Sequence, residues 1–580
     1  MTVTDTYLLL RAFCEELARC GLTQACTSPG SRCTPLVLSL VRAPGIRCYS
    51  HIDERCAGFF AVGAARASRR PVVVSCTSGT ATANLLPAVV EARHARVPLL
   101  VLTADRPPEL REVGAGQTIS QDRLYGDAAK WFFEVGVHDA SPARLRWMRT
   151  LACRAYWTAL AGPAGPVHLN FPLREPLVLE EPLPDDETSR ADGRPYVVWQ
   201  SPSPAPTAAA DDAAGAAAHP SGRIVLVAGA GSPPDLPALA AQARIPLLAD
   251  PLSGARQGPA AVAHYDLLLR DPAFTAAHRP QFVVRVGDLP TSKPLRQWLA
   301  SLPDVAQIAL DPDARWHDPD SVVGLRLPAA GLPSPAATAE PGWLESWLSA
   351  DTVASSAIEH ALGGELSEPG VARSLCDWLP PEATLFVASS MPIRDVEEFA
   401  GVRANAPRVL SNRGANGIDG TVSSAFGAAT SGSGPVVLLI GDVALAHDVG
   451  GLLAARRLGI PLTIVLLNND GGGIFHFLSV AGEADAFEEH VATPHGLEFE
   501  QVAGLYGCRY ERPPTLDELR SAVLRSVQGG ASTIIEVRTD RQANLALHRR
   551  LADEVSAALA RGPGPQNTDA LGAPPRSGRS

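Results

Sequence analysis

Residues 436–475 constrain the fold more than any other stretch of the chain. They begin with an uninterrupted run of β-branched residues and leucine at 436–440, which predicts a buried strand. Apolar residues at helical spacing then predict a helix over 445–458, and a second buried run at 463–467 predicts another strand. Strand, helix and strand in this order form a βαβ unit, so we expect a parallel sheet.

Polar residues follow both strands of this unit. Asp442 comes shortly after the first strand and Asn469 shortly after the second, at the edge where open α/β sheets bind ligands. A carboxylate, an amide oxygen and a backbone carbonyl near Gly471 are ligands that Mg²⁺ accepts. The glycine run 471–473 lets the backbone approach a bulky anion. We therefore expect a metal-bound diphosphate here; the alternative is an ordinary βαβ unit whose polar dipeptides only form turns.

The whole chain has 580 residues, which is too long for one domain. Alternating strand and helix patterns predict three consecutive α/β domains with mostly parallel central sheets, at 1–181, 221–350 and 351–561. The stretch 182–220, rich in Pro, Ala and Asp, is predicted to be a linker, and the tail 562–580 is predicted to be disordered.

Composition excludes several classes of protein. The net charge of −11 argues against a general nucleic-acid or acidic-membrane surface, because such surfaces are basic. No apolar run approaches the roughly 20 residues of a membrane span, and the N-terminus lacks the basic start of a signal peptide. The ten cysteines form no CxxC pair, which indicates reduced side chains. We expect a soluble, cytoplasmic protein with no nucleic-acid partner and no membrane span.

An acidic motif follows another predicted strand. The strand-like run 48–50 leads into the segment HIDER at 51–55, which places Glu54 at the carboxyl end of a strand. The alternative role for Glu54 is to cap the following helix, but Asp53 is already available for that task. The small residues at 57–67 predict a helix that can pack closely against a neighbour.

A weak nucleotide-binding hint lies in the middle of the chain. Gly229 and Gly231 follow a strand-like run, but the third glycine of a dinucleotide fingerprint and its acidic partner are missing. A tight βα turn explains the two glycines better.

Asp442, Asn469 and the glycine run resemble the Gly-Asp…Asn-Asn signature of thiamine diphosphate (ThDP) enzymes, although Val443 stands where many members have glycine. The resemblance implies that Asp442, Asn469 and the carbonyl of Gly471 hold Mg²⁺ or Mn²⁺, and that the metal holds the diphosphate of ThDP.

The resemblance also implies the ThDP-binding fold. Its pyrimidine-binding (Pyr) domain would be 1–181 and its diphosphate-binding (PP) domain 351–561. Gly441 and Ser78 are expected to be further cofactor contacts; Ser78 lies in a turn at a predicted helix start, which suits an anion.

Two catalytic residues follow from the resemblance. Glu54 corresponds to the glutamate that hydrogen-bonds N1′ of the aminopyrimidine and so activates the cofactor, which serves as the electron sink. Ile418, the single aliphatic side chain in the polar, glycine-rich segment 411–420, corresponds to the residue that holds the cofactor bent.

Several arginines also lie in loops after predicted strands. Each alone is typical of a solvated surface charge, but together they predict substrates with more than one carboxylate, which guanidinium groups bind bidentately. They are Arg32, Arg106, Arg394 and Arg413.

The segments SPGSRCTPL, HIDER, TADRPPEL, GAGQTI, NRGANGIDG and NNDGGGIF together resemble the 2-succinyl-5-enolpyruvyl-6-hydroxy-3-cyclohexene-1-carboxylate (SEPHCHC) synthase family of menaquinone biosynthesis. The resemblance implies ThDP-dependent decarboxylation of 2-oxoglutarate and 1,4-addition of the resulting carbanion to isochorismate, giving SEPHCHC and CO₂. It implies a homodimer or homotetramer with active sites at the subunit interface. The substrate-binding residues it implies are Arg32, Arg106, Gln117, Lys293, Ser390, Arg394, Arg413, Ile474 and Phe475.

Three alternatives remain. A 2-oxoacid decarboxylase or carboligase of the acetolactate-synthase type would keep Glu54, Asp442 and Asn469 but would not need the four arginines. An inactive regulatory homologue would be expected to have lost Glu54 or a metal ligand. A nucleotide-binding module would use Gly229 and Gly231.

Overall fold

The structure is a computed structural model, and it describes residues 2–186, 188–199, 221–328, 338–432 and 434–562. The chain forms two compact units. The first comprises the described residues within 1–208, 378–393 and 406–541, and the second those within 209–377, 394–405 and 542–580.

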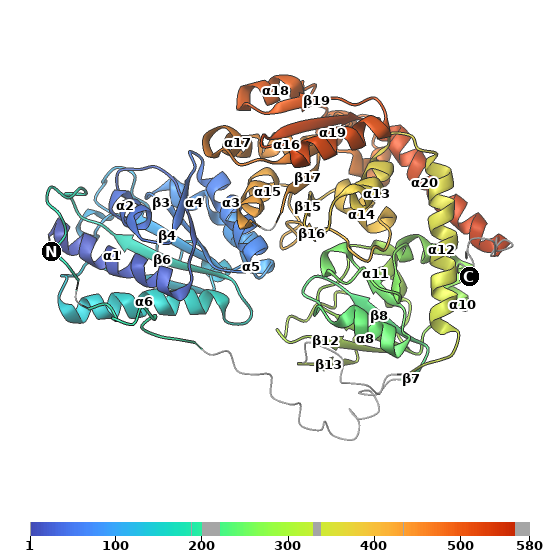
Figure 1. The fold of residues 1–580 in the computed structure, drawn as a ribbon, viewed down its shortest axis with the longest axis horizontal. Helices are drawn as coiled ribbons and strands as arrows, with labels where there is room; N and C mark the ends of the chain where they lie inside the picture. Colours follow the sequence, from blue (N-terminus) through green and yellow to red (C-terminus); the bar gives the residue numbers. More distant parts are fainter. Residues whose placement is uncertain (1, 187, 200–220, 329–337, 433, 563–580) are drawn as a thin grey trace, which may run out of the picture. The chain divides into compact units, whose positions relative to one another are not determined.

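The first unit begins with a six-stranded, all-parallel sheet in the order β2-β1-β3-β4-β6-β5. Its strands are β1 (Gln24–Thr27), β2 (Arg47–Ser50), β3 (Val72–Cys76), β4 (Leu99–Asp105), β5 (Trp131–Glu134) and β6 (Pro166–Pro172). Its helices are α1 (Val3–Cys20), α2 (Thr34–Arg42), α3 (Glu54–Ser68), α4 (Thr80–Ala83), α5 (Leu86–His94) and α6 (Pro142–Leu160). Figure 1 shows α1 and α6 side by side, and their apolar faces form one core with the sheet.

The first unit also holds the third sheet of the chain, which contains the predicted βαβ unit. Its order is β16-β15-β17-β18-β20-β19, again all parallel. The strands are β15 (Thr384–Val387), β16 (Arg408–Leu410), β17 (Val436–Gly441), β18 (Thr463–Asn468), β19 (Arg509–Glu511) and β20 (Thr533–Arg538). Its helices are α15 (Thr421–Ala428), α16 (Asp442–His447), α17 (Leu453–Leu458), α18 (Phe499–Tyr506) and α19 (Leu516–Gln528). Two further helices are divided between the units: α13 (Glu368–Trp378) belongs to the second unit except for its last residue, and α14 (Met391–Phe399) passes from the first unit into the second.

Helices α3 and α15 join these two sheets through one continuous core. A Cβ atom on Gly63 would lie 1.9 Å from the carbonyl oxygen of Ser424, and one on Gly427 would lie 2.0 Å from that of Phe60. Because neither contact leaves room for a side chain, the two helix backbones approach as closely as the small residues of 57–67 predict.

The second unit contains the middle six-stranded sheet of the chain, in the order β10-β9-β8-β11-β12-β13. Its strands are β8 (Ile224–Ala228), β9 (Leu247–Ala249), β10 (Ala261–Val262), β11 (Phe282–Val286), β12 (Ala306–Leu310) and β13 (Leu325–Leu327), with β7 (Ser221–Gly222) and β14 (Thr338–Ala339) as a separate pair. Its helices are α8 (Leu236–Ala243), α9 (Tyr265–Leu268), α10 (Pro272–Ala277), α11 (Lys293–Ala300), α12 (Trp343–Leu362) and most of α20 (Arg541–Arg561).

The G-x-G segment of the second unit forms a tight turn. A Cβ atom on Gly229 would lie 1.7 Å from the carbonyl oxygen of Asp288, and one on Gly287 would lie 2.7 Å from that of Ala230. The glycines therefore let two neighbouring βα turns interlock, which is the structural role that the sequence favours over nucleotide binding.

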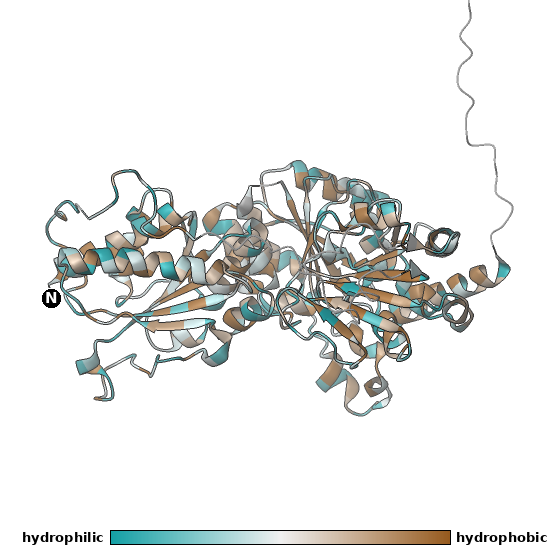
Figure 2. Ribbon diagram, turned by 90° about the horizontal axis from the view of Figure 1, so that it is seen from below, coloured by the Kyte–Doolittle hydropathy of each residue, from teal (hydrophilic) through white to brown (hydrophobic). Residues whose placement is uncertain are grey.

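The expectation of three α/β domains with parallel central sheets is confirmed, and the hydrophobic colouring of the central strands in Figure 2 matches their buried runs. The described part of the linker, 182–186 and 188–199, contains no helix or strand. Residues 200–220 and the predicted disordered tail from 563 onward lie outside the described residues. None of the helices in the described part of the chain combines the length and apolar character needed to cross a membrane.

One expectation about the βαβ unit is wrong. The helix predicted over 445–458 is broken: α16 ends at His447, a 3₁₀ turn covers Val449–Leu452, and α17 starts at Leu453. The apolar periodicity continues through the break, but Gly450 and Gly451, which disfavour a helix interior, lie within it. The buried side chain of Asp448 bonds to a distant segment at the same point.

Candidate functional site

Four predicted residues follow four neighbouring strands of the first sheet. Arg32 follows β1, Glu54 follows β2, Ser78 follows β3 and Arg106 follows β4. Because these strands are parallel and adjacent, the structure brings all four residues to one edge of the sheet.

Ser78, Arg106 and Gln117 form a hydrogen-bonded group at this edge. Arg106 Nη1 donates to Ser78 Oγ at 2.6 Å, and Ser78 Oγ donates to the carbonyl oxygen of Gln117 at 3.0 Å. Gln117 Nε2 donates back to the carbonyl oxygen of Ser78 at 3.0 Å. The sequence separates Gln117 widely from Ser78, so only the fold shows that the two predicted residues belong to one group.

Arg32 supplies a second guanidinium group nearby. Its side chain is buried, and it donates to the carbonyl oxygen of Leu173 at 2.9 Å and to Glu175 Oε1 at 3.0 Å. Burial lowers the pKa of Arg106, and the positive charge of Arg32 lowers it further, while Asp105 and Glu175 oppose that shift. Two neighbouring guanidinium groups are a pattern that suits anionic ligands.

Glu54 is the first residue of α3 and is half-buried. Asp53 caps this helix, since its Oδ1 accepts the backbone N–H of Arg55 at 2.8 Å, and it also pairs with the Arg55 side chain. Within the described residues, no hydrogen bond or ion pair engages the carboxylate of Glu54. Capping is thus Asp53's role, and the Glu54 carboxylate is available for chemistry.

Asp442 ties the ends of β17 and β18 together. Its Oδ2 accepts the backbone N–H groups of Asn469 at 3.1 Å and Gly471 at 3.0 Å, while Oδ1 accepts that of Val443 at 2.7 Å. Burial raises the pKa of Asp442, and the bonds from Gly471 and Val443 oppose that shift. His495 Nε2 lies 3.3 Å from Asp442 Oδ2. No sequence pattern pointed to His495.

The glycine run is required by close packing. Gly471 has a φ of 142°, and a Cβ atom there would lie 2.5 Å from the carbonyl oxygen of Ala492. A Cβ atom on Gly473 would lie 2.8 Å from Asn469 Nδ2. The turn after β18 can therefore hold Asn469 beside Asp442 only because these positions lack side chains.

The donor set fits a hard divalent cation. Asp442 offers a carboxylate, Asn469 an amide oxygen and Gly471 a backbone carbonyl, all of them oxygen ligands of the kind that Mg²⁺ and Mn²⁺ prefer. In the described chain no three His, Cys, Asp or Glu side chains cluster as a metal site. A metal at this edge of the sheet would therefore need amide and backbone oxygens as ligands in addition to the Asp442 carboxylate, which is the composition of the predicted ligand set.

The remaining predicted residues of the first unit lie around the third sheet. Ser390 follows β15 with a φ of 78°, and Arg413 follows β16, where its Nη1 donates to Ser389 Oγ at 3.4 Å. Ile418 is half-buried against the core that α3 and α15 share. The last two, in the turn after the glycine run, are the half-buried Ile474 and the exposed Phe475.

Glu91 of α5, which sequence reasoning missed, anchors the loop that carries Arg413. Its buried carboxylate accepts the backbone N–H of Gly414 at 2.9 Å and that of Ala415 at 2.7 Å, and it pairs with Arg66 at 3.1 Å. The contacts with Gly414 and Ala415 span more than three hundred residues of sequence, so no local pattern signals them.

Lys293 and Arg394 belong to the second unit. Lys293 is the exposed first residue of α11, capped by Ser292, and Arg394 is half-buried on α14. Their roles toward the substrate stay predictions.

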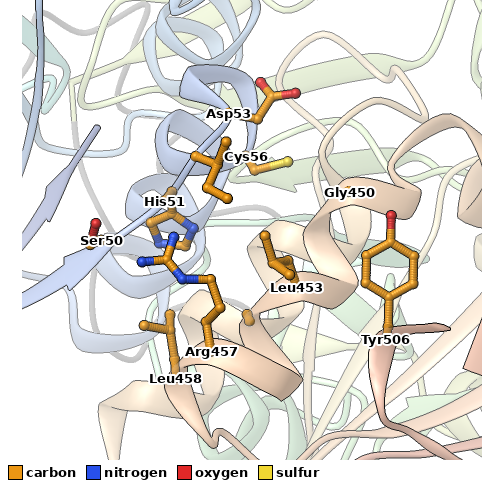
Figure 3. Close-up of a pocket in the computed structure, with 11 residues that line it drawn as sticks. Ser50, His51, Asp53, Cys56, Gly450, Leu453, Arg457, Leu458 and Tyr506 are labelled. Atoms are coloured by element: carbon orange, nitrogen blue, oxygen red, sulfur yellow. The ribbon is translucent and has the colours of Figure 1, made fainter. Parts of the chain in front are cut away.

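A pocket of about 200 Å³ lies beside the turn that carries Glu54. Figure 3 shows His51, Asp53 and Cys56 on one wall and Gly450, Arg457 and Tyr506 on the other. Burial lowers the pKa of His51 to about 4, and the nearby charge of Arg457 contributes, so the imidazole is neutral at pH 7. None of the predicted site residues lines this pocket.

Comparison with known families now defines the class of the protein. Residues 9–124 match the N-terminal TPP binding domain of thiamine pyrophosphate enzymes, residues 196–387 the middle domain, and residues 396–537 the C-terminal TPP binding domain. Thiamine pyrophosphate is another name for ThDP. A benzoylformate decarboxylase from Polynucleobacter necessarius shares the fold, with a TM-score of 0.66 and 18% identity over 92% of this chain and 98% of that one.

Relatives that share one name identify the family within this class. The chain is 44% identical to the 2-succinyl-5-enolpyruvyl-6-hydroxy-3-cyclohexene-1-carboxylate synthase of Chloroflexus aurantiacus, over 95% of this chain and 96% of the relative. It is 42% identical to the synthase of the same name from Geobacillus thermodenitrificans, over 95% and 96%, and 41% identical to that of Halobacterium salinarum, over 95% and 98%. The chain belongs to the SEPHCHC synthase family of thiamine pyrophosphate enzymes.

Proposed function

We propose that this chain is a ThDP-dependent transferase that joins 2-oxoglutarate to isochorismate, with loss of CO₂, to give SEPHCHC in menaquinone biosynthesis. The observation that carries the proposal is the pair of guanidinium groups, Arg32 and Arg106, at the strand edge that also holds Glu54. Both substrates are dicarboxylates, and paired arginines suit them better than a substrate with one carboxylate. The shared name of relatives at 41–44% identity supports the same reaction.

Residues at the ends of β17 and β18 would hold the cofactor. Asp442, Asn469 and the carbonyl of Gly471 would bind Mg²⁺ or Mn²⁺, and the metal would bind the diphosphate, with Gly441 and Ser78 as further contacts. When bound, ThDP supplies an electron sink at the carbon that receives the 2-oxoacid. The hydrogen bonds that Asp442 already accepts from the turn fix its carboxylate before any metal arrives.

Glu54 would exchange a proton with the cofactor. Because Asp53 caps α3, the Glu54 carboxylate is not needed for that task and would hydrogen-bond N1′ of the aminopyrimidine. Ile418 would support the bent cofactor from below, and its place against the α3 and α15 core would keep that support rigid.

The remaining residues would bind and shield the substrates. Ile474 and Phe475 would form an apolar wall that keeps water from the reacting carbon. The polar contacts to the carboxylates would come from Arg32, Arg106, Gln117, Lys293, Ser390, Arg394 and Arg413.

We further propose that the enzyme works in the cytoplasm as a homodimer or homotetramer with active sites at the subunit interface. All ten cysteines are free thiols, which suits a reducing compartment.

The test is a rate assay with the purified chain, ThDP and Mg²⁺. We expect consumption of isochorismate with 2-oxoglutarate and none with pyruvate, followed by mass spectrometry of the adduct. Turnover of pyruvate alone would instead support the acetolactate-synthase-type alternative and overturn the proposal.

A further inference from the structure

The break in the helix after Asp442 places one buried carboxylate between three elements. Asp448 lies between α16 and the 3₁₀ turn Val449–Leu452 and is only 7% exposed. Burying a carboxylate to this degree costs free energy unless hydrogen bonds compensate for the lost water. The hydrogen-bond partners of Asp448 therefore indicate its structural role.

Asp448 caps α15 from outside that helix. Its Oδ2 accepts the backbone N–H of Ser423 at 2.7 Å, and its Oδ1 accepts the Ser423 hydroxyl at 3.0 Å. Ser423 is the third residue of α15, whose N-cap position is Gly420 and has no side chain to accept that N–H. The carboxylate therefore does for α15 what an N-capping side chain does for other helices.

The same carboxylate also reaches α3. Cys56 Sγ donates to Asp448 Oδ1 at 3.7 Å. Burial raises the pKa of the Cys56 thiol to about 12, so the sulfur keeps its proton and remains a donor at neutral pH.

Gly451 makes the contact with α15 possible. A Cβ atom on Gly451 would lie 2.6 Å from Ser423 Oγ and 2.9 Å from its backbone nitrogen. A side chain at this position would therefore push the start of α15 away from Asp448. A Cβ atom on Gly450 would lie 3.4 Å from Cys56 Sγ, which is an ordinary contact, so only Gly451 is required by close packing.

Each of the three elements begins at or directly after a residue of the proposed chemistry. Helix α16 begins with the metal ligand Asp442, α15 follows the loop of Ile418, and α3 begins with Glu54. We propose that Asp448 is a positioning residue, which fixes these three elements relative to one another through Ser423 and Cys56. The expected effect of Asp448 on the reaction rate rests on the proposed function. Its expected effect on the stability of the start of α15 rests on the hydrogen bonds alone.

The ionised carboxylate is the form that accepts both Ser423 donors. Burial raises the pKa of Asp448 to about 6, and the bonds from Ser423 and Cys56 oppose that shift. The other charged groups facing it are Asp53 and Arg55 on the turn that starts α3. Protonation as the pH falls below about 6 removes an acceptor and weakens the cap.

The test compares Asp448→Asn with Asp517→Asn, an exposed aspartate on α19, in the full-length chain. An asparagine side chain would turn an NH₂ group toward one of the donors. We expect kcat to fall about tenfold to a hundredfold with KM for both acids within about twofold, because misplacement of catalytic groups acts on the chemical step. We also expect wild type to lose activity below about pH 6, and the variant to lack that step in its pH profile.

Hydrogen exchange of the chain without cofactor gives an independent reading. Amides at the start of α15 should exchange faster in Asp448→Asn than in wild type or Asp517→Asn. Ser423→Ala removes the hydroxyl donor but keeps the backbone donor, so it should speed exchange at the start of α15 by a smaller amount. It replaces Asp448→Asn in the test if that variant does not fold.

The outcomes separate the two proposals. Wild-type kcat and an unchanged pH profile in Asp448→Asn would overturn the positioning role, as would a lower kcat with no change in α15 exchange. If wild type itself does not join the two acids, the proposed function fails, and the exchange data alone decide whether Asp448 holds α15.

Discussion

The first and third sheets of the chain have the same strand order but different residues at their strand ends. Both sheets are parallel and run in the order second, first, third, fourth, sixth, fifth strand. Arg32, Glu54 and Arg106 follow strands of the first sheet, whereas Asp442, Asn469 and a glycine run follow the central strands β17 and β18 of the third, and Arg413 follows its β16. One topology thus serves as a scaffold twice, and the residues after the strands, rather than the strand order, set which ligands each sheet suits.

The comparison with the middle sheet strengthens this point. Its order, β10-β9-β8-β11-β12-β13, is that of a dinucleotide-binding fold, yet its first βα turn is filled by the close contact of Gly229 with Asp288. Topology alone would have suggested a nucleotide site at a turn where the residues show close packing of two βα turns.

The largest expected effect belongs to the first sheet. Glu54→Gln should lower kcat by about 10³-fold or more, because an amide cannot exchange a proton with the aminopyrimidine. Binding of ThDP and Mg²⁺ should stay near wild type, as measured by calorimetry. A variant with a near-normal rate would remove Glu54 from the chemistry.

The matching change in the third sheet should affect binding instead. Asp442→Ala removes a proposed metal ligand and the acceptor of two N–H groups from the turn after β18. We expect Mg²⁺-dependent affinity for ThDP to fall at least about tenfold to a hundredfold, measured by calorimetric titration. Asp517→Ala, at an exposed position on α19, is the control and should bind as wild type does.

A third change tests whether the first sheet recognises carboxylates. Arg106→Met should raise KM for the acid substrates about tenfold to a hundredfold, since a charge-assisted pair contributes about 1.5–3 kcal/mol. Arg174→Met, which breaks an exposed ion pair with Glu109, is the control. Equal KM values in the two variants would contradict a binding role for Arg106.

The smallest expected effect concerns the contact between the two regions. Glu91→Gln leaves one backbone N–H of the Gly414 and Ala415 pair without an acceptor and breaks the ion pair with Arg66. The free energy of unfolding should fall by about 1–3 kcal/mol, measured by urea denaturation. Glu109→Gln, on the surface, should change it far less.

Local patterns predicted much of this architecture. The apolar runs at 436–440 and 463–467 located β17 and β18, and each prediction missed only the last residue of its strand. Asp53 as the cap of α3 and the close packing of its small residues also followed from sequence.

What the sequence could not predict depends on contacts between distant segments. The bond of Asp448 to Ser423 lies at the break in a helix whose apolar spacing is continuous, and Glu91 holds a loop far along the chain. His495 beside Asp442 is a further case. Hydrophobic periodicity indicates which face of a helix or strand is buried, but not which other segment packs against that face.

The central claim is that a carboxylate-binding sheet and a metal-binding sheet cooperate on two dicarboxylate substrates. It is tested most directly by one competition experiment with wild type, ThDP, Mg²⁺, isochorismate and equal amounts of pyruvate and 2-oxoglutarate. The account predicts that mass spectrometry finds only the adduct derived from 2-oxoglutarate. A mixture of both adducts, or the pyruvate adduct alone, would contradict it.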